Sequence, residues 1–497
     1  MPARKPASKK SEVRSLKSSG RLKSVLQIAS EALPFAKTGG LADVLGALPP
    51  ALSRLGWDVT IVLPRYRGVR EGEVVERFTV TVGGFARPAA FVEAAMADGA
   101  RAVLVDCPEL YDRDDLYTIG GADYPDNARR FAFLVRAALE YAGRRGGRPS
   151  VVHAHDWQAA LAPVYLRTLY ADHPVLGGTP SVLTIHNLAY QGLFEADWLP
   201  RLDLGWDQFT VDRLEYWHRI SYLKGGINSA DAITTVSARY AAEIQTPAFG
   251  FGFDGILRAR HRDLAGILNG IDTTEWDPTR DRFLPQPYSA GDLEGKRAAK
   301  VEVMRRYGLP TDTAALARPL VGMVSRMVDQ KGLDLIAALE RELPRLDASF
   351  VVLGTGDARY QHFWRALAAA HPDRIGARVG FDEGLAHLIE GGADLFLMPS
   401  RFEPSGLNQM YSMRYGTVPL VHAVGGLADT VSPKTGFAFD EYTPAALLAC
   451  LTRALQTFRD RRKWRALQRA GMAKDFSWDR SAKEYVKIYD RVLKQRT

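Results

Sequence analysis

The chain has 497 residues, of which 46% are hydrophobic and 25% are charged. This length exceeds what a single hydrophobic core supports, so we expect two large domains. The composition is that of a globular protein and excludes collagen-like and wholly disordered classes. Because no run of about 18 apolar residues occurs, the sequence predicts no membrane span.

The positive charge is concentrated at the N-terminus. The formal net charge is +8, and residues 1–23 hold eight Lys or Arg against one Glu, a net +7 that leaves about +1 for the rest. A nearly neutral body argues against a nucleic-acid partner. We expect residues 1–22 to be a disordered tail. The tail lacks the apolar stretch of a secretory signal, and an organellar transit segment is the less favoured alternative.

The two cysteines, Cys107 and Cys450, lie far apart in the sequence and match no disulfide or metal pattern. This usage suits a reducing compartment, so we expect a cytoplasmic protein.

The first predicted strand covers residues 23–30, and a helix is predicted from Gly39-Gly40 to Leu52. Paired glycines allow the backbone to approach a phosphate, and Lys37 stands beside them as a point charge. The spacing matches neither a GxGxxG fingerprint nor a P-loop. Further strands are predicted at residues 57–64, 78–82 and 101–105.

A polar loop is expected at residues 111–127, followed by an amphipathic helix to Ala142. Three aspartates in the loop could be imagined as a metal cluster, but no His and no regular ligand spacing accompany them, which favours a solvated acidic loop. They are Asp112, Asp114 and Asp115.

The strand at residues 150–157 carries His153 and His155 on one face. A zinc pair would fit this spacing, but a third ligand and the HExxH pattern are missing, so one His near a sugar is the preferred interpretation. The next strand ends at Asn187, and Ser237 is a predicted N-cap after the strand at residues 232–237.

The strand–helix rhythm restarts after residues 278–296, which resemble a linker. Strands are predicted at residues 319–326, 349–354, 393–399 and 418–421, so we expect two doubly wound sheets. The pentapeptide Gly-Gly-Leu-Ala-Asp occurs at residues 39–43 and again at 425–429. Two facing Gly-Gly helix starts would clamp a diphosphate, although chance repetition of so simple a pattern is the alternative.

The loop at residues 400–409 joins a buried strand to a helix expected from Gly406 to Tyr415 and stopped by Gly416. A helix N-terminus there attracts phosphate, and the carboxylate of Glu403 suits sugar hydroxyls, which together predict a nucleotide-sugar site. The alternative is an ordinary turn with a solvated glutamate. Arg326 and Lys331 follow another strand and could stabilise a departing diphosphate.

Taken together these motifs resemble bacterial glycogen synthases and plant starch synthases over residues 23–490. The resemblance rests on blocks in the order Lys-Thr-Gly-Gly-Leu-Ala-Asp-Val (37–44), His-Ala-His-Asp-Trp (153–157), His-Asn-Leu-Ala-Tyr-Gln-Gly (186–192), Leu-Asn-Gly (268–270), Ser-Arg (325–326), Gln-Lys-Gly (330–332) and Ser-Arg-Phe-Glu-Pro (400–404). It implies an α/β protein of the GT-B fold, with two doubly wound Rossmann-like domains facing across a cleft. The domains expected are residues 23–275 on the acceptor side and 276–475 on the nucleotide-sugar side, with a final helix in 476–497 crossing back.

The resemblance also implies the roles of individual residues. Those expected to carry catalysis are Lys37, His155, Arg326, Lys331 and Glu403. Those expected to bind substrate are Gly39, Gly40, Asp43, Asp126, Asn187, Asn269, Gly354, Phe381, Ser405, Gly406, Leu407 and Asn408. Ser405, Asn408 and Phe381 depart from common family residues, Cys, Thr and Tyr, yet keep small polar groups near the phosphate and a ring beside the base.

The implied reaction moves glucose from ADP-glucose to the non-reducing 4-hydroxyl of an α-1,4-glucan such as glycogen, with retained configuration, no cofactor and no metal. Same-face substitution is favoured over double displacement through Glu403. The alternatives are a related transferase using UDP-glucose or another acceptor, a catalytically silent glucan-binding protein, and a dinucleotide-dependent oxidoreductase, which lacks its fingerprint here. No nucleic-acid or membrane partner is expected, and the oligomeric state is left open.

Overall fold

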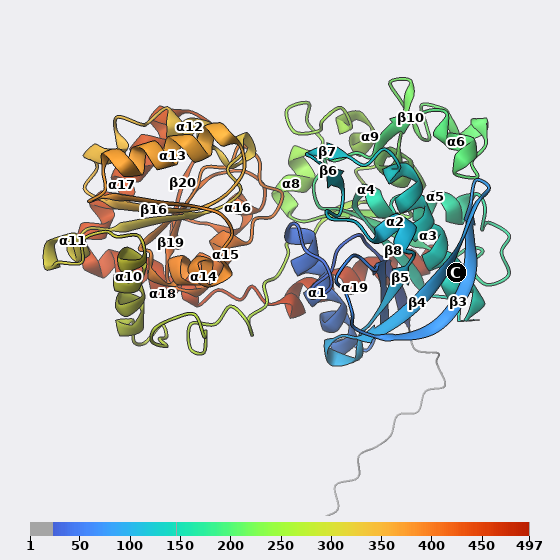
Figure 1. Cartoon of the computed structure of the whole chain (residues 1–497), viewed down its shortest axis with the longest axis horizontal. Helices are drawn as coiled ribbons and strands as arrows, with labels where there is room; N and C mark the ends of the chain where they lie inside the picture. The colour runs from blue at the N-terminus through green and yellow to red at the C-terminus, as the bar shows by residue number, and fades with distance from the viewer. Residues whose placement is uncertain (1–22, 146, 497) are drawn as a thin grey trace, which may run out of the picture.

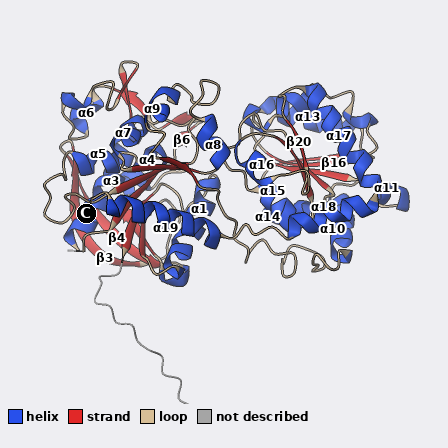
Figure 2. Cartoon of the chain, turned by 180° about the vertical axis from the view of Figure 1, so that it is seen from behind, coloured by secondary structure: helices blue, strands red, loops and turns tan. Residues whose placement is uncertain are grey.

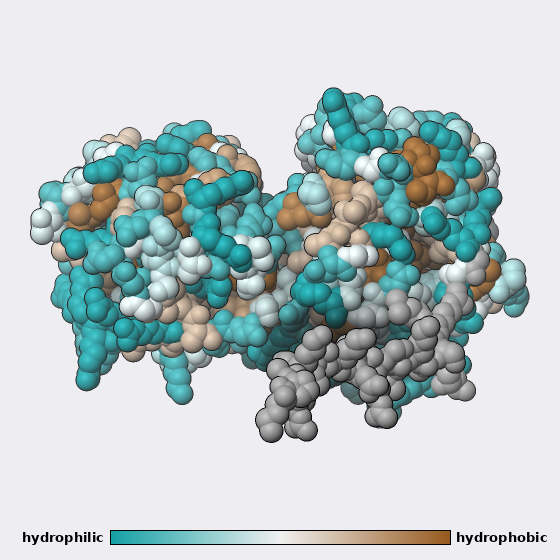
Figure 3. Space-filling view, turned by 90° about the horizontal axis from the view of Figure 1, so that it is seen from below, coloured by the Kyte–Doolittle hydropathy of each residue, from teal (hydrophilic) through white to brown (hydrophobic). Residues whose placement is uncertain are grey.

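A computed structural model describes residues 23–145 and 147–496. The chain forms two lobes, each built on a twisted sheet with helices on both faces (Figure 1). This confirms the predicted fold of two doubly wound sheets. On the face shown in Figure 3 a notch separates the two lobes. Within the described residues no helix combines the length and apolar character needed to cross a lipid bilayer.

The first lobe contains a nine-stranded sheet in the order β14-β13-β9-β8-β1-β2-β5-β4-β3. Seven strands are parallel, and the hairpin of β3 and β4 adds an antiparallel edge. The strand bounds are β1 Ser24–Ile28, β2 Asp58–Pro64, β3 Glu73–Val82, β4 Phe85–Ala95, β5 Arg101–Asp106, β8 Val151–His155, β9 Ser181–Ile185, β13 Ala232–Thr235 and β14 Leu264–Gly266.

The second lobe contains a six-stranded, all-parallel sheet in the order β17-β16-β15-β18-β19-β20. Counted within the lobe this is 3-2-1-4-5-6, the dinucleotide-fold order, whose switch point lies between β15 and β18. The bounds are β15 Leu320–Val324, β16 Ser349–Gly354, β17 Ile375–Val379, β18 Leu395–Met398, β19 Val418–His422 and β20 Phe437–Phe439.

The helices of each lobe follow its strands, as crossovers between parallel strands require. Those of the first lobe are α1 Gly40–Arg54, α2 Pro108–Tyr111, α3 Asn127–Arg144, α4 Asp156–Ala159, α5 Leu161–Arg167, α6 Trp198–Arg201, α7 Tyr222–Ser229, α8 Ala238–Glu243 and α9 Asp254–Ala259. Those of the second are α10 Glu294–Arg306, α11 Thr313–Ala317, α12 Leu333–Ala337, α13 Ala358–Ala370, α14 Glu383–Gly392, α15 Asn408–Arg414, α16 Gly425–Thr430, α17 Pro444–Arg459 and α18 Arg461–Met472.

Short elements complete the connections between these strands and helices. The minor strands are β6 Thr118–Ile119, β7 Ala122–Asp123, β10 Leu193–Glu195, β11 Glu215–Tyr216 and β12 Arg219–Ser221. The 3-10 turns are η1 Ala97–Gly99, η2 Trp206–Gln208, η3 Asp329–Lys331 and η4 Leu343–Arg345.

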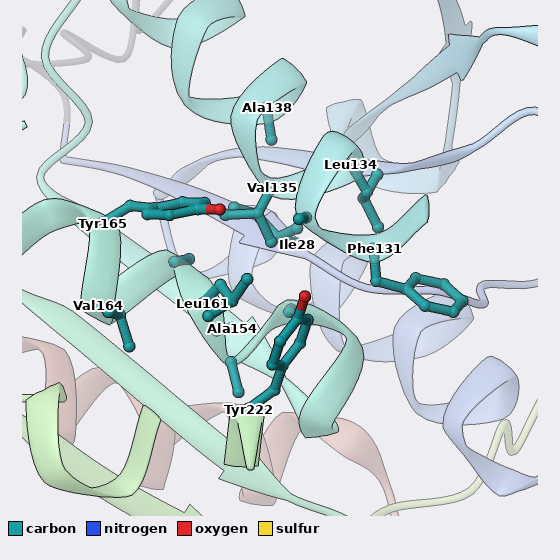
Figure 4. Close-up of a cluster of buried hydrophobic side chains, with 14 of the residues drawn as sticks. Ile28, Phe131, Leu134, Val135, Ala138, Ala154, Leu161, Val164, Tyr165 and Tyr222 are labelled. Carbon is teal, nitrogen blue, oxygen red and sulfur yellow. The ribbon is translucent and has the colours of Figure 1, made fainter. Parts of the chain in front are cut away.

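Each sheet separates two hydrophobic cores. On one face of the first sheet α3 packs its apolar side against α5, with Phe131, Val135 and Tyr165 fully buried (Figure 4). Apolar residues at three- and four-residue spacing give α3 this buried stripe. The other three cores repeat the arrangement, so helices cover both faces of each sheet (Figure 2).

The last helix, α19 Trp478–Lys494, leaves the second lobe and packs against α1 of the first. In Figure 1 its red ribbon lies behind the first sheet, and in Figure 2, seen from behind, the helix is in front. The hydroxyl of Tyr489 is 2.7 Å from Nδ1 of His153 on β8. The last helix is therefore part of the hydrophobic core that lies between α1 and the first sheet.

Several elements differ from the sequence prediction. The strand predicted at residues 78–82 is the end of the longer β3, and its partner β4 was not predicted, nor were β17 and β20. The predicted loop at 111–127 contains the small hairpin of β6 and β7. The helix predicted from Gly406 begins at Asn408, because Gly406 has the left-handed φ of +67° that ends a turn.

Candidate active site

The five residues predicted to carry catalysis lie at the switch points of the two sheets. In the first sheet the switch lies between β1, which leads to the Lys37 loop, and β8, which ends at His155. In the second it lies between β15 and β18, which are followed by Arg326 and by the Glu403 loop. Ligands of doubly wound folds bind beyond the carboxyl ends of such strands.

Direct contacts bring the two switch points together. A Cβ placed on Gly40 would lie 3.8 Å from Cδ1 of Leu407, so the start of α1 faces the Glu403 loop. The hydroxyl of Ser237 donates a 2.7 Å hydrogen bond to the carbonyl of Pro404. Ser237 also caps α8, as predicted. The two predicted halves of the site therefore face each other across the junction of the lobes.

The repeated Gly-Gly of the second lobe does not serve as the predicted phosphate clamp. The backbone N–H of Gly425 donates to both carboxylate oxygens of Glu243, at 3.1 Å each. Both glycines are buried where α16 packs against α8 (Figures 1 and 2). The prediction is wrong for this copy because a carboxylate from the other lobe already occupies the helix N-terminus.

The Lys37 loop is organised by Glu31, a buried carboxylate that the sequence analysis did not single out. Glu31 accepts hydrogen bonds from the backbone N–H of Thr38, from its hydroxyl at 2.6 Å and from the N–H of Gly39 at 3.3 Å. Lys37 lies 2.7 Å from Asp43. Burial raises the pKa of Asp43, although the adjacent ammonium opposes that shift. The loop is thus held in shape before any ligand binds.

His155 ends β8 fully buried, with its Nδ1 3.0 Å from Nε2 of His186. Its own Nε2 has no hydrogen-bond partner in the described part of the chain. Burial, reinforced by the neighbouring His153 and His186, holds the pKa of His155 well below its ordinary value. Burial also lowers the pKa of His186 to about 3. Both imidazoles are neutral near pH 7, so His155 can offer a neutral nitrogen to a hydroxyl.

Asp156 supports the histidine pair and was also missed by the sequence analysis. Its carboxylate accepts the backbone N–H of His186 at 2.7 Å and that of Asn187 at 3.4 Å. Burial raises the pKa of Asp156 to about 7. Asn187 in turn accepts the N–H of Ala189 through its own Oδ1. These bonds fix the loop after β9 beneath His155.

In the second lobe the ammonium of Lys331 lies 2.6 Å from Oε2 of Glu403. The hydroxyl of Ser400 donates to the same oxygen at 2.9 Å. Glu403 exposes 9% of its side chain and Lys331 18%. Arg326 is exposed and donates to the side chain of Gln330 at 3.1 Å. Two cations after β15 and a carboxylate after β18 therefore stand at the ends of neighbouring strands.

The residues predicted to line the nucleotide lie on the next strands. Gly354 ends β16, where a Cβ would lie 1.9 Å from the carbonyl of Ser325, so only glycine fits. Its carbonyl accepts the N–H of Gly380, which places Phe381 beside it. The ring of Phe381 is 86% exposed. An exposed ring at this edge is free to stack on a planar base.

Three predicted site residues hold buried polar atoms that have no hydrogen-bond partner among the described residues. They are His155 through Nε2, Asn269 through Oδ1 and Ser405 through Oγ. Buried polar groups are normally hydrogen-bonded, so an unpaired one calls for an explanation such as a bound ligand. The first lies at the end of β8 in the first sheet, the second comes shortly after β14 of the same sheet, and the third belongs to the Glu403 loop. A ligand with several hydroxyl or phosphate oxygens would satisfy them.

Two predicted substrate residues have other partners. Asp126 accepts two hydrogen bonds from Arg113, at 2.7 and 2.6 Å, so its carboxylate is engaged within the first lobe. Asn408 donates from Nδ2 to the carbonyl of Val324 at 3.1 Å, which ties α15 to the end of β15. Both residues support the loops of the site through these bonds.

The acidic loop carries no metal cluster in the residues that the structure describes. Asp112 and Asp114 accept hydrogen bonds from Arg67 instead. A different group of potential ligands, Glu275, Glu383 and His387, lies together beside the linker, and its histidine Nδ1 is 2.8 Å from Asp281. That group contains none of the predicted site residues.

The chain matches two protein-family models, the starch synthase catalytic domain over residues 24–259 and glycosyl transferases group 1 over residues 313–469. It is 51% identical over 475 residues to a glycogen synthase of Anaeromyxobacter dehalogenans strain 2CP-C, covering 94% of this chain and 98% of the relative. It is 47% identical to a glycogen synthase of Koribacter versatilis, again over 94% and 98% of the two chains.

Solved structures agree with this similarity. The catalytic domain of starch synthase IV from Arabidopsis thaliana, bound to ADP and acarbose, superposes with a TM-score of 0.86 at 32% identity, covering 96% of this chain and all of that one. Sucrose-phosphate synthase from Thermosynechococcus elongatus superposes with a TM-score of 0.61 at 17% identity, covering 95% and 100%. The second likeness concerns the fold alone.

Proposed function

This chain belongs to the glycogen synthase family of glycosyltransferases, and we propose that it transfers glucose from ADP-glucose to the non-reducing end of an α-1,4-glucan with retention of configuration. The observation that carries the proposal is the set of three unpaired buried polar atoms, on His155, Asn269 and Ser405. The same site offers the two cations after β15 and an exposed aromatic ring. A nucleoside diphosphate sugar supplies a partner for each of these features. Its hydroxyls can pair with the buried polar atoms, its diphosphate with the cations and its base with the ring.

In the proposed mechanism, Arg326 and Lys331 neutralise the diphosphate as the sugar–oxygen bond breaks. The amides of Gly406 and Leu407 hold its oxygens near the start of α15, and Lys37, Gly39 and Gly40 border the same space from the other lobe. This cationic set supplies the charge stabilisation that a divalent ion provides in other transferases, so we propose that transfer needs no metal.

His155 and Glu403 act on the sugar in this proposal. The neutral His155 bonds a glucose hydroxyl through its free nitrogen. Glu403, held by Lys331 and Ser400, accepts hydrogen bonds from other glucose hydroxyls and forms no covalent bond to the reacting carbon. The acceptor hydroxyl then attacks the face that the diphosphate leaves, which retains the configuration.

The proposed setting is a reducing cytoplasm. Cys107 and Cys450 are both buried free thiols, in keeping with that setting.

The deciding experiment measures transfer of labelled glucose from ADP-glucose and, separately, from UDP-glucose onto glycogen in the presence of EDTA. We expect incorporation mainly from ADP-glucose, in α-1,4 linkage and at an undiminished rate. Preference for UDP-glucose would assign the chain to a different donor. Absence of transfer from both, with glycogen still bound, would identify a silent glucan-binding protein.

A further inference from the structure

A tight turn in the first lobe holds an exposed tryptophan in an unfavourable backbone conformation. Trp217 and His218 join β11 to β12, which pair antiparallel with Tyr216 opposite Arg219. The φ angles of the two turn residues are +53° and +64°. Two-residue turns of this hand favour Asn-Gly because both positions are left-handed. Trp217 is also 79% exposed, so neither turn geometry nor burial accounts for an indole at this position.

A second exposed aromatic residue in a left-handed conformation lies against this hairpin. Phe251 has φ of +48° and is 39% exposed. Its carbonyl accepts from the hydroxyl of Tyr216 at 3.3 Å and from Nε2 of Gln191 at 2.8 Å. A Cβ on the next residue, Gly252, would lie 2.1 Å from the Tyr216 hydroxyl, so glycine is required for this contact. The loop and the hairpin are therefore locked together.

The aromatic residues continue from the hairpin to the candidate active site. The ring centroids of Trp217 and Tyr216 are 6.4 Å apart, and Phe251 meets Phe402 edge to face at 5.4 Å. Phe402 immediately precedes Glu403. We call these four residues, Trp217, Tyr216, Phe251 and Phe402, the aromatic track. The hairpin lies beside β10 at the top of the first lobe in Figure 1, so the track crosses from that edge to the second lobe.

We propose that the aromatic track binds the glucan acceptor, with Trp217 contacting sugar units remote from the one that reacts. This inference rests on the proposed function. Pyranose rings present C–H faces that stack on aromatic rings, and an uncharged polymer needs no ionic partner. Continuity with Glu403 argues for the glucan, because a chain whose end reaches the donor must leave the cleft along its wall. Strained residues persist where function requires their side chains.

The proposal predicts a dependence on acceptor length. A long glucan reaches Trp217, whereas an acceptor of two or three units ends within the cleft. Trp217 is therefore expected to contribute to the binding of glycogen and long maltodextrins and to set the preference of the enzyme for them.

The test compares two full-length variants that differ only at the indole. One carries His218→Gly, and the other carries Trp217→Asn together with His218→Gly. Glycine at the second position favours the turn in both, and Asn-Gly is the preferred pair, so both are expected to fold. Glycogen binding is measured without donor by affinity electrophoresis, and kcat/KM is measured with glycogen and with maltotriose.

The expected result is roughly five- to tenfold weaker glycogen binding in the variant without the indole. The ratio of kcat/KM for glycogen to that for maltotriose falls by a similar factor. Trp206→Ala removes another exposed tryptophan, 60% exposed and outside the track, as the matched control. Equal glycogen binding in the two variants, or the same loss in Trp206→Ala, would overturn the proposal. Because binding is measured without donor, this result is independent of whether ADP-glucose is the donor.

Discussion

Nζ of Lys331 lies 2.6 Å from Oε2 of Glu403, although the two residues are 72 positions apart in the sequence. The cation follows β15 and the carboxylate follows β18, the neighbouring strands of the switch point. One ion pair therefore joins the group proposed to receive the leaving diphosphate with the group proposed to hold the sugar. We therefore expect Lys331 to contact both anions when the diphosphate binds.

Removal of the Lys331 charge is expected to abolish most catalysis. Lys331→Ala should lower kcat roughly 10²- to 10³-fold, because charge on the leaving diphosphate goes uncompensated. It also leaves Glu403 buried without its cation, which lowers stability. The double variant with Glu403→Gln should recover the melting temperature and leave kcat low. Near-normal turnover of Lys331→Ala would refute the assignment.

Glu403 is not expected to form a bond to glucose. Incubation of a slowed variant, Lys331→Ala, with ADP-glucose followed by mass spectrometry of the intact protein should show no added hexose. The position of the Glu403 carboxylate beside Lys331 and Ser400 suits the binding of sugar hydroxyls. A covalent glucosyl group on Glu403 would establish double displacement instead.

Loss of the His155 imidazole is expected to weaken the binding of the transition state by the enzyme. His155→Ala should reduce kcat/KM for ADP-glucose roughly ten- to a hundredfold, the range for losing a buried hydrogen bond and leaving its partner unpaired. His155→Gln keeps a donor and an acceptor and should recover part of the loss. If both variants match the unsubstituted chain in steady-state kinetics, the sugar contact is elsewhere.

Phe381 is expected to act on donor binding alone. Phe381→Ala should raise KM for ADP-glucose roughly five- to tenfold through lost stacking on the base. The ring is 86% exposed, so the free energy of unfolding should change by less than about 0.5 kcal/mol. Phe381→Tyr keeps the ring and serves as the control. An unchanged KM in the alanine variant would remove Phe381 from the nucleotide site.

Asp156 is expected to make stability depend on pH. Its pKa is raised by burial to about 7 in the folded chain, against about 3.9 when unfolded, so the fold favours the protonated carboxyl. The contribution of Asp156 to the free energy of unfolding is complete below pH 4. It declines as the pH rises to 7, by up to about 4 kcal/mol. Asp156→Asn can accept the same backbone bonds and does not titrate.

Urea unfolding at several pH values should therefore show the variant gaining stability over the unsubstituted chain between pH 4 and 7, with a constant difference above. All other titrating groups are common to both proteins and cancel in the comparison. Parallel stability curves across that range would show that Asp156 is already ionised in the fold.

The sequence by itself determined the local features of this protein. Apolar runs ending in glycine or polar residues marked β1, β8, β15 and β18, since buried parallel strands require such runs. Short motifs placed Lys37, His155 and Glu403 at or just after the ends of those strands, because such motifs depend on neighbouring residues. The helix cap at Ser237 was predicted for the same reason. Spacing also put His153 and His155 on one face, where their rings lie 4.0 Å apart.

Only the tertiary structure decided which of these groups pair. The partners of Glu31, Asp156 and Glu243 have no local signal, yet each carboxylate accepts backbone N–H groups that the fold would otherwise leave unpaired. Glu243 also turned the second Gly-Gly from a predicted phosphate clamp into a contact between the lobes. Partners of this kind lie far apart along the chain, and strand order and burial bring them together. The hydrogen-bond partners and the pKa values of the site residues therefore depend on tertiary packing. The local sequence does not encode this packing.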